Sequence, residues 1–390
     1  MKVTQLHELV NSVTQEVLGA EAVVQEDLSN IVAIGKEIVN TENVDNYVKK
    51  LVNHIGKVVF VNRLYAGGVP SVLMDSWEYG SILEKVSADL PNATENESWE
   101  LTDGKTYNPD VFYQPKVSAQ FFNSMITFEI PLSFTERQVK ESFSNANQLN
   151  GFISMLTTSV ENAMTVRLDA LIMRTINNMT AETLASELDP EATGTIELTN
   201  GSVRAVNLLA KYNASKEAEN QITLAESLTN PDFIRFATYT IGIYSDRMSK
   251  ISTLFNGGSK ERFTPKDLQH TVLLSDFAVA SETFLRADLQ NAEKVTLPNH
   301  DTVPYWQGSG VDYSFDEISR IDVKTSTGKT VQVGGIIGVM FDRDALGVTN
   351  LDRRVTTNYN PKAEFYTNFY KFDSGYYNDL NENFVVFYVA

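Results

Sequence analysis

Apolar residues recur at three- and four-residue steps from position 149 to position 171, which is the period of an α-helix. Just before this stretch, Ser133-Phe134-Thr135-Glu136 has the order of a capping box, so we expect the helix to begin there. The pattern predicts one helix far longer than the roughly 11–12 residues of an average globular helix, a spine on which a sheet can pack. The residues of its predicted core are Leu149, Ile153, Leu156, Val160, Met164, Leu168 and Leu171.

Two strand candidates, at 77–86 and 117–133, flank a long segment that has few aliphatic residues and two proline-bearing turn signals. Structureless loops this long are uncommon in compact domains, so the pattern predicts a projecting hairpin. A hairpin alone is marginally stable in water and needs another surface to lie on. Aromatic residues near its end favour a docking role over a mobile insertion; they are Trp99, Tyr107, Phe112 and Tyr113.

The rest of the chain divides into a helical start and a mixed central part. Residues 1–60 show helical apolar spacing, and residues 190–345 alternate between helix and strand. In the central part we expect a short helix after Asn200-Gly201-Ser202 and a second helix opening at Pro231. The remaining predictions there are a strand at 270–280, a hairpin at 320–335 with its turn from Ser326 to Lys329, and a buried strand that runs into a short helix within 335–348.

The last strand candidate is apolar on both of its alternating faces. Phe384, Val386 and Tyr388 share one face, while Val385, Phe387 and Val389 share the other. Such a strand is normally covered on both sides. We expect one face to lie on the long helix. The other face is buried either within its own domain or by a neighbouring subunit.

Charge and composition narrow the function classes. The net charge is −18, which argues against a nucleic-acid-binding surface over much of the molecule, because such surfaces depend on Lys and Arg. The absence of cysteine excludes disulfides and thiolate-ligated zinc. The longest clean apolar run, at 334–341, is far shorter than the ~18 residues of a membrane span, and Glu8 interrupts any signal-peptide pattern. We therefore expect a soluble protein of a cytoplasm.

A search for catalytic motifs finds none. Four scattered histidines show no paired ligand spacing, and Gly328-Lys329-Thr330 lacks the earlier glycine of a phosphate-binding loop because position 323 is Val323. The sequence thus predicts no catalytic, cofactor-binding or metal-binding residue, and no cofactor. An acidic glycoside hydrolase stays an alternative, because its two carboxylates meet only in the fold.

Three stretches resemble the major capsid proteins of tailed bacteriophages. The stretch 128–172 resembles the strand and spine helix of that family, 334–348 its strand-helix passage, and 353–389 its C-terminal strands. The resemblance implies an α+β capsid fold with an N-terminal arm (1–60), an extended hairpin loop (86–118) and an axial domain (190–345). A peripheral domain with the spine helix would comprise 61–85, 119–189 and 346–390.

The same resemblance implies a structural, non-enzymatic function. Copies would assemble through pentamers and hexamers into an icosahedral shell around double-stranded DNA, which the shell would enclose without tight sequence-specific binding. Portal and scaffolding proteins are the further partners implied, and no membrane is. The protein would be assembled in the host bacterial cytoplasm and end in the virion. An encapsulin-type nanocompartment shell, which uses a related fold, is the nearest alternative.

Overall fold

The computed structural model describes residues 11, 14–15, 72–74, 82–91, 93–135, 146–188, 194–196, 198, 201–287, 297–306, 320–325, 328 and 330–390. The expected helices of the first sixty residues therefore lie outside the described residues, apart from isolated positions. The chain forms two compact units. The first comprises 1–78, 125–172 and 348–375, and the second 79–124, 173–347 and 376–390.

The first unit contains a four-stranded sheet with the order β1-β12-β13-β4. These strands are β1 (Leu73–Met74), β12 (Leu346–Asn360), β13 (Phe365–Asn378) and β4 (Met125–Thr135). β4 and β13 pair antiparallel over eleven register positions, from Phe365 opposite Thr135 to Gly375 opposite Met125. One face of this ribbon is apolar, with Phe128 and Phe372 in ring contact at 5.1 Å, and the other is polar. The division follows from strand geometry, because successive side chains of a β-strand point to opposite faces of the sheet.

Polar pairs cross the exposed face of β4 and β13. Asp373 accepts a hydrogen bond from Thr127 at 2.6 Å and pairs with Arg354 at 2.6 Å. Lys371 lies 3.1 Å from Glu129. Cross-strand pairs of this kind stabilise a sheet and fix its register.

Helix α5 (Ala146–Leu188) runs through 43 residues and contributes to both units. The capping-box prediction for its start was wrong. Ser133, Phe134 and Thr135 lie in β4, opposite Thr367, Tyr366 and Phe365, because the alternation of apolar and polar residues continues the strand to Thr135. The helix then begins at Ala146.

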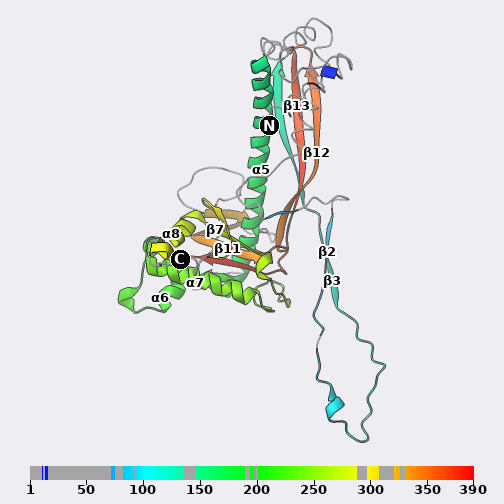
Figure 1. Cartoon of the computed structure of the whole chain (residues 1–390), viewed down its shortest axis with the longest axis vertical. Helices are drawn as coiled ribbons and strands as arrows, with labels where there is room; N and C mark the ends of the chain where they lie inside the picture. The colour runs from blue at the N-terminus through cyan, green and yellow to red at the C-terminus, as the bar shows by residue number, and fades with distance from the viewer. Residues whose placement is uncertain are drawn as a thin grey trace. The chain divides into compact units, whose positions relative to one another are not determined.

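The second unit is built on a five-stranded sheet with the order β6-β14-β11-β7-β8. Figure 1 shows β11 and β7 of this sheet beside the helices of the unit. Its strands are β6 (Ala205–Asn207), β14 (Phe384–Tyr388), β11 (Ile336–Asp342), β7 (Gln269–Leu274) and β8 (Asp301–Val303). Its helices are α6 (Leu208–Ala214), α7 (Pro231–Met248) and α8 (Ser275–Ala287), of which α7 packs against the other two. A smaller sheet has the order β5-β10-β9, from Gly194–Thr195, Thr330–Gly334 and Arg320–Lys324.

Helix starts in this unit follow local capping chemistry. Asn230 accepts hydrogen bonds from the backbone N–H groups of Asp232 and Phe233, and Pro231 stands in the first turn of α7 as predicted. Asn207 caps α6 by accepting from Ala210. Four short 3₁₀ turns complete the described elements, at Glu97–Trp99, Ala218–Asn220, Leu224–Glu226 and Lys266–Leu268.

The structure confirms the antiparallel hairpin of β9 and β10 and corrects two other predictions. The strand expected at 270–280 ends at Leu274, because α8 begins at Ser275. The short helix expected after the buried strand β11 is a turn into β12. Asp342 closes that turn by accepting from the Asp344 N–H at 2.8 Å and from the Ala345 N–H at 2.9 Å.

The two-faced apolar strand β14 is buried inside its own unit. It lies between β6 and β11, and Phe384, Val386 and Tyr388 have no exposed surface. Phe387 on the other face meets Tyr244 of α7 edge-on at 5.4 Å. Of the two alternatives for the second face, the structure supports burial within the same chain, because every residue of β14 is buried without a neighbouring subunit.

Candidate assembly interface

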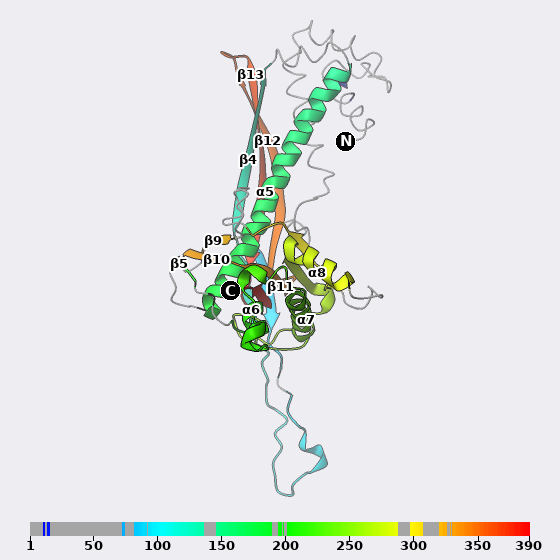
Figure 2. The ribbon, with the colours of Figure 1, turned by 90° about the vertical axis from the view of Figure 1, so that its left-hand side faces the viewer.

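The extended hairpin is the most exposed structure of the second unit. β2 (Leu83–Ala88) and β3 (Val117–Phe122) pair antiparallel along their whole length, from Leu83 opposite Phe122 to Ala88 opposite Val117. The alternation along β2 turns Lys85 and Ser87 inward and Glu84 and Val86 outward. The ladder closes with a backbone hydrogen bond from Asp89 to Lys116 at 2.9 Å. The loop 89–116 then leads away from the five-stranded sheet (Figures 1 and 2).

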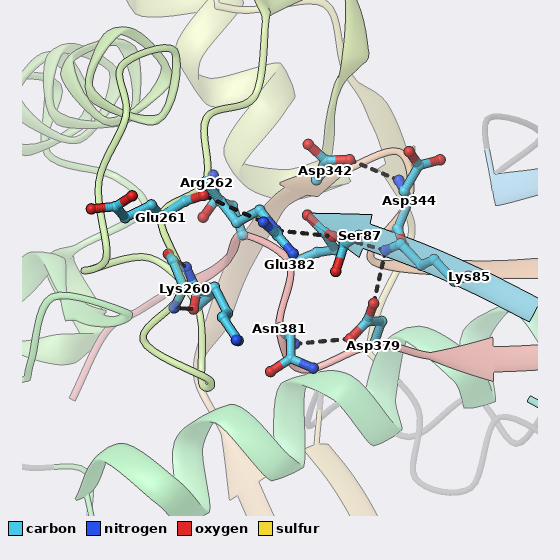
Figure 3. Close-up of polar contacts among 12 residues, drawn as sticks. Lys85, Ser87, Lys260, Glu261, Arg262, Asp342, Asp344, Asp379, Asn381 and Glu382 are labelled. Atoms are coloured by element: carbon cyan, nitrogen blue, oxygen red, sulfur yellow. Dashed lines mark hydrogen bonds and ion pairs between the residues drawn. The ribbon is translucent and has the colours of Figure 1, made fainter. Parts of the chain in front are cut away.

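A cluster of charged residues holds the root of this hairpin (Figure 3). The Lys85 ammonium lies 2.8 Å from Asp379 and 2.9 Å from Glu382, and it donates to the Asp344 carbonyl at 3.0 Å. Arg262 meets the same Glu382 carboxylate at 3.3 Å. The Asp379 side chain is only 2% exposed, so its charge depends on Lys85 for compensation. We call Lys85, Arg262, Asp379 and Glu382 the root cluster.

The loops that supply the root cluster are tied to one another. The Thr264 hydroxyl donates to Asp342 at 2.6 Å, Asn383 donates to Thr264 at 3.1 Å, and the Asp342 N–H donates to the Asn383 carbonyl at 2.9 Å. Phe122 of the hairpin also meets the Tyr377 ring at 5.1 Å. Burial and the nearby carboxylates raise the pKa of Tyr377 well above its usual value, so this ring carries a neutral hydroxyl. The root of the hairpin is thus fixed by charge and packing.

Beyond its root, the loop presents aromatic side chains to solvent. Trp99 is 95% exposed, Phe112 84% and Tyr113 83%. Tyr107 is less exposed: its hydroxyl accepts from the Thr102 N–H at 3.2 Å, and Lys105 lies over its ring. Large aromatics exposed in this way on one segment are typical of an interaction surface. The structure therefore brings all four predicted aromatics to one exposed loop.

The other predicted residues that have described side chains are buried in the core. Val160, Met164, Leu168 and Leu171 of α5 are buried, while Leu149, Ile153 and Leu156 lie in α5 with side chains outside the described residues. Phe384, Val386 and Tyr388 lie in β14, an interior strand of the five-stranded sheet.

Sequence reasoning missed the root cluster and a second surface. Lys85 and Asp379 stand 294 residues apart, so no local pattern could pair them. The second surface is the segment 247–266, in which Ile251, Leu254 and Phe263 are more than half exposed. The five Lys and Arg residues that this segment carries within an acidic chain were a usable signal.

The described part of the chain holds no group of three or more His, Asp or Glu residues that could bind a metal ion. No helix among the described residues is long and apolar enough to cross a membrane. Within those residues the arrangement is one of polar anchoring and exposed aromatics, which is the chemistry of protein–protein contact.

Comparisons with known proteins agree with this picture. The family model of Phi29-like phage major capsid proteins matches residues 10–388. No curated protein sequence matches the chain. Among solved structures, the capsid of Staphylococcus phage Andhra matches with a TM-score of 0.50 at 10% identity, covering 84% of this chain and 86% of that one.

Two further solved structures are similar. The capsid of cyanophage P-SCSP1u matches with a TM-score of 0.47 at 10% identity, covering 86% of this chain and 94% of that one. The mature capsid of bacteriophage PhiM1 matches with a TM-score of 0.43 at 9% identity, covering 85% of this chain and 88% of that one. At such identities the likeness concerns the fold, and the fold of the Andhra capsid protein is shared.

Proposed function

Because this chain belongs to the family of Phi29-like phage major capsid proteins, we propose that its loop 89–116 docks on a neighbouring copy in the head shell. The chain is a structural major capsid protein of the virion, and many copies of it build the phage shell. The observation that carries the proposal is the exposure of Trp99, Phe112 and Tyr113 on a loop whose root is fixed by charge.

The fixed root favours docking over a mobile insertion. A loop that is anchored at its base loses less conformational freedom when its far end binds, so more of the contact energy contributes to affinity. Aromatic side chains bury about 150–250 Å² each and dominate the energetics of interfaces. A lone hairpin also needs a second surface for stability, and a neighbouring copy would supply it.

The finer assembly follows from closed symmetry. Head-to-tail contacts between identical chains close into rings, and pentamers and hexamers would together form an icosahedral shell around double-stranded DNA. The residues 1–60 would form an arm, 86–118 the extended loop, 190–345 the axial domain, and 61–85, 119–189 and 346–390 the peripheral domain. Portal and scaffolding proteins would be further partners, assembly would take place in the host cytoplasm, and the chain would catalyse no reaction.

Removing the aromatics tests the docking. Replacing Trp99, Phe112 and Tyr113 together by Ser should leave the subunit folded, because these side chains touch solvent, but should abolish particle formation. Each truncated interface anchor costs about 2 kcal/mol or more, and the loss repeats at every contact of the shell. Sedimentation and negative-stain microscopy measure particle yield, and circular dichroism checks the fold.

The matched control keeps the aromatic character. Trp99→Phe, Phe112→Tyr and Tyr113→Phe together should still assemble, because each ring can still fill a pocket on the neighbour. Particles at wild-type yield from the serine variant would refute docking by this loop.

A further inference from the structure

We infer that the surface that receives the loop 89–116 is the segment 247–266 of a second copy of this chain. This inference rests on the proposed docking of the loop and adds the place where it docks. Four observations on the second unit support it: opposite charge, exposed apolar residues, a rigid frame, and loop aromatics that stay exposed although an ion pair joins the two segments at the loop's first residue.

The two segments carry opposite charge. The loop 89–116 has six Asp and Glu residues against two Lys, whereas 247–266 has five Lys and Arg residues against the single Glu261. Three of the basic residues pair within the same chain, Lys260 with Asp89, Arg262 with Glu382 and Lys266 with Asp246, so the charge offered to a second copy rests on Arg247 and Lys250. A basic segment is unusual in a chain with a net charge of −18. Complementary charge on two surfaces steers encounter and fixes register, and it opposes contact between like-charged faces.

The basic segment also offers apolar partners for the aromatic rings. Ile251, Leu254 and Phe263 are each more than half exposed, although Phe255 and Thr264 of the same segment are buried. Exposed apolar residues gathered among Lys and Arg match a loop that mixes Trp and Phe with Asp and Glu. Arg and Lys can further lie over aromatic rings, which adds to the attraction.

The frame of the segment is rigid. Ser252 and Arg262 exchange two backbone hydrogen bonds of 2.9 and 3.1 Å, and Asn256 exchanges two side-chain bonds of 2.7 Å with the Lys260 backbone. The Phe255 carbonyl accepts from the Phe384 N–H of β14 at 2.8 Å, which ties the segment to the central sheet. A surface held in this way is pre-organised for binding.

Within one copy, an ion pair joins the two segments where the loop begins. Lys260 lies 3.3 Å from Asp89, the first residue of the loop, whereas Trp99, Phe112 and Tyr113 are exposed. Lys250 is exposed and makes no ion pair within the described part of the chain. The loop's aromatics and this lysine therefore remain available, and a head-to-tail contact between copies would join them.

Charge reversal on each side tests the pairing. Glu100→Lys with Asp103→Lys reverses the loop, and Arg247→Glu with Lys250→Glu reverses the segment; all four side chains are exposed, so the subunit should stay folded. Each reversed pair should lower particle yield about tenfold or more at low ionic strength, and the four changes combined should restore it. Matched controls are Glu217→Lys and Lys324→Glu, which are exposed elsewhere in the second unit and should change nothing.

The cysteine-free chain permits a second test that does not depend on charge. Thr106→Cys and Thr253→Cys are made as separate variants, mixed, assembled and treated with a flexible bis-maleimide. A cross-linked dimer that contains one chain of each variant supports the inference. Absence of that dimer in assembled particles overturns it, as does a purely intramolecular cross-link in the double variant.

The outcomes separate the two proposals. If the serine variant of the loop abolishes assembly while reversal of the segment does not, the loop docks elsewhere and only this inference fails. If neither change affects assembly, the docking of the loop itself fails.

Discussion

At the scale of single residues, Lys85 joins the hairpin to the body of the second unit. Its ammonium meets two carboxylates and a carbonyl that come from the loops after β11 and β13. A carboxylate as buried as Asp379 is stable as an anion only while a cation and donors surround it. The lysine therefore contributes to the stability of the junction between the hairpin and the body of the unit.

Replacing Lys85 by Met should destabilise the second unit. The change keeps most of the apolar stem but leaves Asp379 without its cation, and breaking a buried pair on one side costs about 3 kcal/mol. Urea unfolding followed by circular dichroism measures the loss. Lys324→Met, at an exposed position of β9, is the control and should leave the midpoint within experimental error. An unchanged midpoint for Lys85→Met would show that the pair contributes nothing.

Two buried tyrosines make stability depend on alkaline pH. Burial raises the pKa of Tyr370 and that of Tyr388 to about 12, whereas an unfolded tyrosine ionises near pH 10. The folded state thus disfavours the phenolate form of both tyrosines. The contribution of their neutral hydroxyls to the free energy of unfolding is complete below about pH 10 and is lost as pH rises toward about 12. The urea midpoint should fall across that window. Tyr370→Phe should make the fall less steep, and an equally steep fall would contradict the assignment.

The residue scale also shows what the sequence alone can identify. Trp99, Phe112 and Tyr113 could be selected in advance because large aromatics are rare in a polar loop, and the structure leaves them exposed. The root cluster could not be selected, because its members are common charged residues and become neighbours only when β2 meets the loop after β13.

At the scale of elements, the central sheet of the second unit depends on one close approach. A Cβ at Gly338 of β11 would lie 2.5 Å from the Leu273 side chain and 2.7 Å from the Val272 carbonyl of β7. Only a residue without a side chain lets the two strands pair at this position.

Gly338→Ala should therefore push β11 and β7 apart. Overpacking of a close-packed interior typically costs about 1–3 kcal/mol. Gly242 of α7 offers a matched control, because nothing lies within 4 Å of its added Cβ. Gly242→Ala should instead stabilise the helix by up to about 1 kcal/mol. Thermal unfolding of the two variants should shift in opposite directions, and a shift in the same direction would contradict this account.

Predictions for the elements succeeded where the signal was local. Pro231 and the alternation of 320–335 located α7 and the hairpin of β9 and β10. The capping box predicted at 133–136 failed because pairing with β13 decides the state of residues 133–135, and that partner lies more than two hundred positions away. For β14, the two apolar faces indicated full burial. Only the sheet order shows that the residues that bury both faces belong to the same unit.

At the scale of the whole molecule, the order of elements carried more information than any motif. A long hairpin, a very long helix, a mixed central part and a strand-rich end together resembled a capsid protein, and the family match extends over residues 10–388. The sequence could not provide the surfaces on which copies meet, because these depend on which side chains the fold leaves exposed.

The net charge leads to a prediction about DNA. A shell of subunits that each carry a charge of −18 should repel a polyanion rather than bind it. Purified subunits should bind double-stranded DNA weakly, with almost no dependence of the binding constant on salt. A protein that neutralises several phosphates would instead lose affinity steeply as salt rises. Fluorescence anisotropy with a labelled duplex measures this, and a steep salt slope would contradict enclosure without binding.

The strand pairings have a consequence for the time a new chain needs to reach its native state. Leu73 pairs with Val348, Ile130 with Tyr370, and Ala205 with Val386. Most sheets can therefore form only after strands that are far apart in the sequence have met. Chains dominated by such distant pairings fold slowly, over milliseconds to seconds, and expose unpaired strand edges meanwhile. Newly synthesised chains should therefore accumulate faster than they mature, and dependence on chaperones is the expected result.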